Sequence, residues 1–216
     1  MSGSDPAVWR LGHRDAPLAF VPLEHCGWEG RWDDPRRAYR TLYAARDVAT
    51  CLREVLADLR PDTAMLAELR ELFGRDAGLE AAAGTVPREF RDQRVVAAAY
   101  ARADDGELVD IDAPAVRAEL ERDHAPLLAE HGMRHLDVSE IRSRTRVVSQ
   151  RIGRVLYENG AAGIAFGSNL DDRPCYAVFE ARGRLVRRGR ARPLELTEDL
   201  PELVAVCAEY GLRLTG

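Results

Sequence analysis

The sequence predicts an α+β fold with a mixed, largely antiparallel sheet and flanking helices. Strand-like and helical segments are intermingled along the 216 residues, without the steady strand–helix–strand repeat of a doubly wound fold. Two strand-like segments also flank Asp104-Asp105-Gly106, and an Asp-Gly pair supplies the positive φ angles that a tight β-hairpin requires. A hairpin pairs its two strands antiparallel, which favours the mixed sheet.

The first half of the chain is expected to contain short strands followed by two helices. Asp47 is suited to cap a helix whose apolar residues recur at helical spacing until Pro61 stops the pattern. A second helix is expected from residue 62 or 63 to Phe73, with Gly74 closing it. The strands expected in this half are residues 8–11, 18–23 and 41–45, the last a compact apolar run.

The second half is expected to mix helices with further strands. A helix is expected at 145–159, because its apolar residues share one face and Gly160 stands where a C-terminal glycine belongs. A charged helical stretch at 115–130 is interrupted at Pro126, and a last helix is expected at 200–210. The strands expected here are 94–101 and 107–111, which form the hairpin, and 163–167, 175–181 and 185–186.

The chain is expected to form one domain. It contains no Pro-, Gly- or Ser-rich linker and no internal repeat, and its 46% hydrophobic and 31% charged residues are typical of a soluble folded protein. A chain of this size buries roughly 70% of the surface that its unfolded form exposes, so the core needs no disulfide or metal. Residues 1–6 are short and polar and are expected to be disordered, with the domain spanning residues 7–216.

The charged residues exclude several classes of function. The net charge of -5 argues against direct nucleic-acid binding, which needs a surplus of Lys and Arg. The chain contains no lysine, which excludes Schiff-base chemistry and a P-loop lysine. One stretch is locally basic, and it is either a solvated strand and loop or a surface for an acidic partner or phosphate. Its arginines are Arg182, Arg184, Arg187, Arg188, Arg190 and Arg192.

Cysteine and histidine spacing predicts no metal site. The four cysteines are far apart and form no C-x-x-C pair. His131 and His135 are four residues apart, but no Glu stands beside the first histidine and Gly132 weakens a helix there. The sequence shows no signal peptide and no apolar run near 18 residues, so we expect a cytoplasmic protein with reduced thiols and no membrane span.

Four scattered polar residues are left as candidates for chemistry. Arg31 lies beside an aromatic residue in a turn, and Tyr43 lies inside an apolar strand, where a buried hydroxyl needs a partner. Glu54 borders the apolar face of its helix, so it is either a snorkelling surface residue or a carboxylate aimed into a cleft. Ser168 follows a strand and either caps it or faces a ligand. It lacks the second glycine of a serine-hydrolase elbow.

These positions resemble the RES-domain family from about Trp9 to Phe179. The shared features are a Gly-Arg-aromatic turn at 30–35, a Leu-Tyr-small strand at 41–45 and a Leu-x-Glu-Val-Leu helix at 51–56. A closing strand pair follows at 163–168 and 175–179. The chain departs from the family pattern where Asp33 and Asp34 replace Asn or another polar residue, and where Phe166-Gly167 replaces Tyr/Leu-Pro. The segment 62–89 is also longer than in compact members.

The resemblance implies a fold similar to ADP-ribosyltransferases, with NAD⁺ as substrate in a cleft between sheet and helices. Members are usually toxins neutralised by an Xre-type antitoxin, and they hydrolyse or phosphorolyse NAD⁺ or transfer ADP-ribose to a protein. On this basis Glu54 would stabilise the cationic ribose, and Arg31 would bind a phosphate or the ribose. Tyr43 would stack on nicotinamide, Ser168 and more weakly Asn169 would hydrogen-bond it or its ribose, and no metal is required.

Three other interpretations stay open from the sequence. The first is an enzyme that transfers ADP-ribose to a protein, the second is a catalytically inactive module that binds a partner, and the third is an unrelated α+β domain. The last interpretation leaves Arg31 and Glu54 far apart in space. The basic stretch at 182–192 also offers one docking surface for an acidic antitoxin segment.

Overall fold

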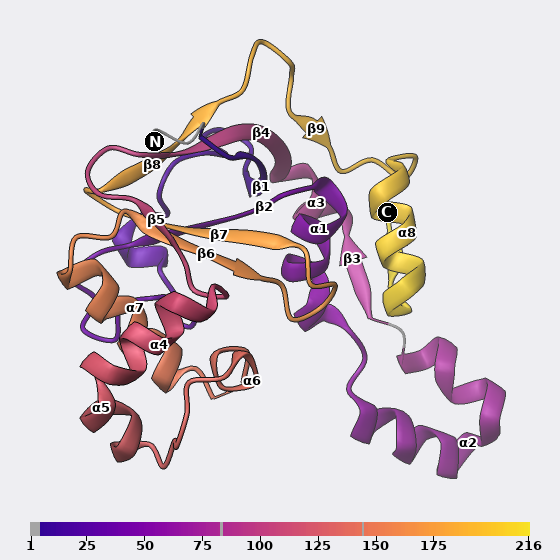
Figure 1. Cartoon of the computed structure of the whole chain (residues 1–216). Helices are drawn as coiled ribbons and strands as arrows, with labels where there is room; N and C mark the ends of the chain where they lie inside the picture. Colours follow the sequence, from indigo (N-terminus) through magenta and orange to yellow (C-terminus); the bar gives the residue numbers. More distant parts are fainter. Residues whose placement is uncertain (1–4, 83, 144) are drawn as a thin grey trace.

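A central sheet dominates the computed structural model, which describes residues 5–82, 84–143 and 145–216 (Figure 1). Its strand order is β5-β6-β7-β2-β1-β4-β8, and β9 pairs with β4. Every pair in this sheet is antiparallel except β5 with β6, so the predicted α+β fold with a largely antiparallel sheet is confirmed. The strands are β1 (Ala7–His13), β2 (Thr41–Ala45), β4 (Arg94–Ala103), β5 (Leu108–Asp110), β6 (Gly163–Gly167), β7 (Pro174–Phe179), β8 (Gly183–Arg187) and β9 (Leu194–Glu195).

The helices other than α2 gather at two places against this sheet, and α2 extends away from it, as Figure 1 shows. The helices are α1 (Val48–Leu56), α2 (Thr63–Ala82), α3 (Arg88–Asp92), α4 (Pro114–Asp123), α5 (Ala125–Glu130), α6 (Val138–Ile141), α7 (Val147–Glu158) and α8 (Pro201–Tyr210). Two 3₁₀ turns lie at Leu23–His25 and Ala57–Leu59. Within the described residues, no helix is both long enough and apolar enough to span a membrane.

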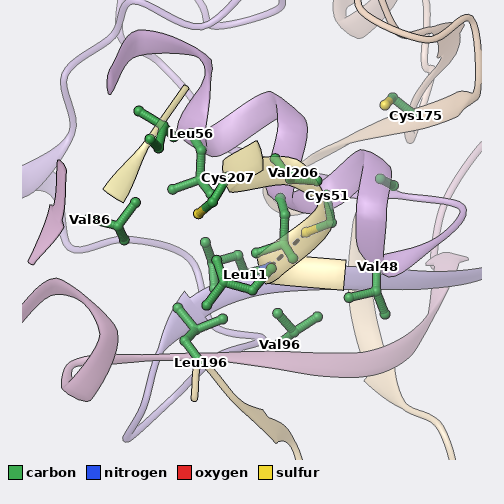
Figure 2. Packing of buried hydrophobic residues seen from close by; sticks show 14 residues of the cluster. Leu11, Val48, Cys51, Leu56, Val86, Val96, Cys175, Leu196, Val206 and Cys207 are labelled. Carbon is green, nitrogen blue, oxygen red and sulfur yellow. Dashed lines mark hydrogen bonds between the residues drawn. The ribbon is translucent and has the colours of Figure 1, made fainter. Parts of the chain in front are cut away.

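One apolar core holds α1 and α8 against the sheet (Figure 2). Asp47 caps α1 as predicted, and its carboxylate accepts a hydrogen bond from the Thr50 N–H at 2.8 Å. Leu52 of α1 and Leu203 of α8 are fully buried in this core. The Sγ atom of Cys51 accepts a hydrogen bond from the Leu11 N–H at 3.0 Å, which ties α1 to β1.

A second core lies between the sheet and the helices α4 to α7. Trp32 and Phe179 are fully buried in it, and the helices contribute residues such as Ile141 and Ile152. Trp32 meets the ring of Phe166 edge-on, with centroids 5.6 Å apart. Phe166 packs against both this core and the core under α1, so it marks the boundary between the two.

The predicted hairpin between β4 and β5 is wrong. β4 uses its two edges for β1 and β8, and β5 pairs in parallel with β6. The turn itself forms, with Gly106 at a φ of 83°, but the N–H groups of Asp104 and Asp105 donate to the Arg182 carbonyl. Because β4 has no free edge, the chain crosses the sheet and β5 pairs with the free edge of β6.

The strand predicted at 18–23 is also wrong. β4 pairs with β1 along its whole length, and β2 pairs with the other edge of β1 at Trp9 and Ala45. Pro17 and Pro22 also lack the N–H that a ladder needs. Instead, Leu18 and Phe20 pack as a loop over a third apolar cluster, which contains Val8 and Leu42.

Several further features, α3 and β9 among them, go beyond what the sequence predicts. Helix α2 continues to Ala82, although Gly74 breaks its helical geometry with a φ of 80°. Helix α6 and a small parallel sheet of β3 (Thr85–Pro87) with β10 (Arg213–Thr215) were not expected. Of the segment predicted to be disordered, residues 1–4 lie outside the described ones. Asp5 and Pro6 contact β4 through Arg102 and Ala101.

Adjacent residues of α8 offer a matched test of this core. Leu203 is fully buried and Val204 is 45% exposed. We expect Leu203→Ala to lower the free energy of unfolding by about 2–5 kcal/mol, because it removes buried methyl groups and leaves a cavity. Val204→Ala should cost less than about 1 kcal/mol. Denaturant titration of both variants checks this, and equal losses would contradict the packing of α8 described here.

Candidate active site

The turn that carries Arg31 is closed by its own backbone and by Asp33. The Asp33 N–H donates to the Gly30 carbonyl at 3.2 Å, and the Gly30 N–H donates to Asp33 Oδ2 at 2.7 Å. The Arg31 guanidinium donates through Nη1 to the carbonyls of Ile141 at 2.5 Å and Ser143 at 3.0 Å. The turn is thereby joined to the segment between α6 and α7.

The hydroxyl of Tyr43 has two partners in the same turn. It donates to Asp33 Oδ1 at 2.8 Å and accepts from the Trp32 N–H at 2.9 Å. Burial, followed by the nearby charge of Asp33, raises the pKa of Tyr43 well above its usual 10. The phenol therefore stays protonated, and the part of Tyr43 that can meet a ligand is its ring.

Glu54 and Ser168 meet although 114 residues separate them in sequence. Ser168 Oγ donates to Glu54 Oε1 at 2.6 Å and accepts from the Leu170 N–H at 3.0 Å. Ser168 is only 1% exposed. The serine hydroxyl thus fixes one oxygen of the Glu54 carboxylate at the border of α1.

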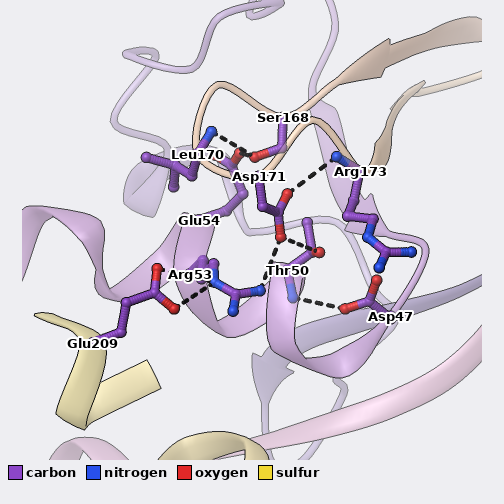
Figure 3. A network of polar contacts seen from close by, with 9 residues as sticks. All are labelled: Asp47, Thr50, Arg53, Glu54, Ser168, Leu170, Asp171, Arg173 and Glu209. Carbon is purple, nitrogen blue, oxygen red and sulfur yellow. Dashed lines mark hydrogen bonds and ion pairs between the residues drawn. The ribbon is translucent and has the colours of Figure 1, made fainter. Parts of the chain in front are cut away.

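Asp171 fastens the loop that follows Ser168 to α1 (Figure 3). Its Oδ2 atom accepts from Thr50 Oγ1 at 2.6 Å and from Arg53 Nη1 at 3.0 Å, and Oδ1 accepts from the Arg173 N–H at 3.1 Å. Arg53 also pairs with Glu209 at 2.9 Å. Partial burial acts to raise the pKa of Asp171, but these hydrogen bonds outweigh it and the pKa is lowered.

Two adjoining hollows open beside these residues. The inner cavity, of about 300 Å³, is lined by Arg31, Tyr43 and Glu54 together with Phe166. The outer cleft, of about 1000 Å³, shares Arg31, Glu54 and Phe166 and adds Asn169. Ser168 lines neither hollow and reaches them only through Glu54. The structure therefore brings Arg31, Tyr43 and Glu54 to one cavity, with Ser168 directly behind Glu54.

Asn169 lies on the wall of the outer cleft with its amide already engaged. Its Nδ2 atom donates to the Arg142 carbonyl at 2.7 Å. Arg142 in turn pairs with Asp112 at 3.0 Å and with Asp172 at 2.7 Å. This set of contacts holds the loop after β6 against the segment between α6 and α7.

The two hollows are lined by charges of both signs, since Glu54 and Asp58 lie in both linings beside two arginines. Arg31 and Arg146 line both of them, and among the described residues neither has a carboxylate within 4 Å. Burial lowers the pKa of Arg31, and the charge of Arg146 adds to this, although a guanidinium stays charged at neutral pH. Two cations without anionic partners make the cleft suited to a ligand that carries negative charge.

The inner cavity is lined by residues of β1 and β2, which pair at only one point. The two strands pair at Trp9 and Ala45. Beyond this pair the guanidinium of Arg10 fills the gap, donating to the Tyr43 carbonyl at 2.7 Å and to the Pro17 carbonyl at 3.1 Å. Arg10 is part of the cavity lining, so Tyr43 is held at its backbone as well as at its hydroxyl.

Sequence reasoning missed several residues of this site. Arg10 and Arg146 were not singled out, because Arg is the chain's only basic residue besides His and its position carries little signal. Asp33 and Phe166 were noted as departures from the family pattern. The direct succession of Asp33 after the Gly30-Arg31-Trp32 turn was the one local signal for its role.

The other groups considered from the sequence lie elsewhere. His135 Nδ1 lies 3.0 Å from Glu121 Oε1 on an exposed surface. Arg182 pairs with Asp105 at 3.2 Å, and Arg184 pairs with Asp104. Arg187 donates to the Ala191 carbonyl at 2.9 Å and Arg188 lies over the Trp9 ring, so four of the six arginines of the basic stretch have partners within the chain. In the part of the chain that the structure describes, no three His, Cys, Asp or Glu side chains group as metal ligands would.

The loop anchored by Asp171 makes a prediction about pH. Because the pKa of Asp171 is lowered in the folded state, its contribution to stability is present above its unfolded pKa of about 3.9 and is lost as the pH falls. We expect Asp171→Asn to lower the Tm at pH 7, and the gap to wild type should narrow below about pH 4. Thermal melts between pH 7 and pH 3 measure this. A gap of constant size over that range would contradict it.

Comparison with known proteins identifies the family. The family model described as "RES domain" matches residues 7–197. One chain of the M. tuberculosis MbcT–MbcA toxin–antitoxin complex has a similar fold, with a TM-score of 0.50 and 14% sequence identity over 96% of this chain and 90% of that one. No curated protein sequence matches. Since the family model covers most of the sequence, the chain belongs to the RES-domain family.

Proposed function

We propose that this RES domain is a toxin-like enzyme that consumes NAD⁺ by breaking the bond between nicotinamide and ribose, with water or phosphate as acceptor. The observation that carries the proposal is the meeting of Arg31, Tyr43 and Glu54 at one cavity, with Ser168 bonded to Glu54. NAD⁺ combines a cationic aromatic ring with an anionic diphosphate. The hollows offer an aromatic ring, a carboxylate and two arginines without carboxylate partners.

Glu54 would stabilise the charge that develops during cleavage. When the bond to nicotinamide breaks, its electron pair leaves with the ring nitrogen and positive charge builds on the ribose. A carboxylate facing that ribose lowers the barrier, as in glycoside cleavage. The hydrogen bond from Ser168 orients the carboxylate before the substrate arrives, so little reorganisation is needed.

The remaining residues would bind and orient the dinucleotide. The ring of Tyr43 would stack on nicotinamide while its hydroxyl stays bonded to Asp33. Arg31 and Arg146 would face the diphosphate or the ribose through their planar donor groups. Ser168 would act mainly through Glu54, and Asn169 would contribute at the rim of the outer cleft.

An antitoxin partner in the cytoplasm is part of the same proposal. The RES family resemblance and the similar fold in a toxin–antitoxin complex support a protein partner that holds the enzyme inactive. An Xre-type antitoxin is the expected kind. The unpaired arginines of the outer cleft would suit an acidic segment of such a partner, because that segment would occupy the place of the diphosphate.

The experiment is to follow the loss of NAD⁺ with purified protein, with and without phosphate. We expect Glu54→Gln to lower kcat by at least about 10²-fold, because it removes the charge that faces the developing cation. Glu130→Gln is the matched control, since Glu130 is a helix glutamate paired with Arg151 outside both hollows. Its rate should equal that of wild type.

Three outcomes separate the possible reactions. Loss of NAD⁺ that requires phosphate indicates phosphorolysis, and loss without it indicates hydrolysis. If NAD⁺ is lost only when a protein substrate is present and that protein becomes labelled, the protein is an ADP-ribosyltransferase. If wild type consumes no NAD⁺ under any of these conditions, the enzyme proposal fails and a module that only binds a partner is left.

A further inference from the structure

Among the residues that the structure describes, Asp33 is the one charged side chain that hydrogen-bonds both to the Arg31 turn and to the Tyr43 hydroxyl. One carboxylate oxygen accepts from the Gly30 N–H at 2.7 Å, and the other accepts from the Tyr43 hydroxyl at 2.8 Å. Asp33 lines neither hollow, so it reaches a ligand only through its two partners. The packing is also close, since a Cβ atom added at Gly30 would collide with the Tyr43 hydroxyl and with the Asp33 carboxylate.

From these contacts we infer that Asp33 is a positioning residue, which sets the Tyr43 ring and the Arg31 turn relative to one another so that both face the substrate cavity. This inference rests on the proposed function. The two contacts come from opposite carboxylate oxygens and both partners are donors, so the role needs two acceptor atoms. An amide offers only one, because its other atom is a donor itself.

Although the family pattern has Asn or another polar residue here, an Asn of nearly the same shape cannot serve both the Gly30 N–H and the Tyr43 hydroxyl as they lie in this chain. If its NH₂ faces Gly30, two donors meet. If its NH₂ faces Tyr43, the phenol proton loses its acceptor, because an NH₂ group only donates. The proton cannot turn to Trp32 instead, because the Trp32 N–H is itself a donor to that hydroxyl. In either orientation one buried donor is left without a partner, and the Tyr43 ring or the Arg31 turn is released.

The test measures NAD⁺ consumption in Asp33→Asn, Tyr43→Phe and the double variant. We expect Asp33→Asn to lower kcat/KM about tenfold, mainly through a higher KM, since the Tyr43 ring is a binding contact. A loss of folded protein alone would lower the apparent kcat and leave KM unchanged. In the Tyr43→Phe background the same substitution should change kcat/KM less than about twofold, because the shared contact is already absent.

Asp34→Asn is the matched control. Asp34 follows Asp33 directly and is fully buried, but it pairs with Arg154 at 3.0 Å and accepts from the Ala38 N–H, away from Tyr43. We expect it to lower the Tm and to leave KM as in wild type. A rise in KM equal to that of Asp33→Asn would overturn the inference, because any loosening of the turn would then suffice.

A thermal version of the same cycle needs no activity and separates this inference from the proposed function. If the Tm losses of Asp33→Asn and Tyr43→Phe are less than additive, the two side chains are coupled as the structure shows. Additive losses, or a kcat/KM that Asp33→Asn leaves within twofold of wild type, overturn the inference. If the Tm losses of the two variants are coupled but the wild-type protein consumes no NAD⁺, the contact between Asp33 and Tyr43 stands and the proposed function fails.

Discussion

The antiparallel pairing of β2 with β7 is the constraint on which the candidate site depends. Its register sets Ala45 opposite Cys175, so the beginning of α1, which follows β2, and the loop before β7 meet at the same end of the two strands. Glu54 then reaches Ser168, and Asp171 reaches back to Thr50 and Arg53. These contacts join parts of the chain that are far apart in sequence, so they form only when the sheet is complete. The pair of Glu54 and Ser168 therefore depends on the folded domain and not on a local motif.

The site holds charges of both signs close together with few direct ion pairs. The Glu54 carboxylate is fixed by a hydroxyl, and the Arg31 guanidinium is fixed by two carbonyls. Each group is thus oriented without being neutralised, and a ligand with complementary charges can replace the missing partners. A dinucleotide with a cationic ring and an anionic diphosphate has this complement. Asp33 holds the hydroxyl of Tyr43 from behind the ring and lines neither hollow.

Most local elements were predictable from the sequence, although not the loop at 18–23, and strand partners were not. The Asp47 cap, the strand at Thr41–Ala45 and the glycine after α7 follow from residues adjacent in the chain. The pairing of β4 depends on which edges β1 and β8 leave free, which no local pattern records. At the site, the order of four motifs indicated Arg31, Tyr43, Glu54 and Ser168. The roles of Arg10 and Arg146 arise from tertiary contacts, which the sequence does not show. Asp33 stands out in the sequence only as a departure from the family pattern, because its contact with Tyr43 spans ten residues.

The proposed NAD⁺ site is tested most directly by a structure of the Glu54→Gln protein with NAD⁺ bound, since this variant should keep the shape of the cavity and slow the cleavage. We expect nicotinamide in the inner cavity against the Tyr43 ring and the diphosphate along Arg31 and Arg146. NAD⁺ bound elsewhere on the protein, or an empty cavity at saturating NAD⁺, would contradict it.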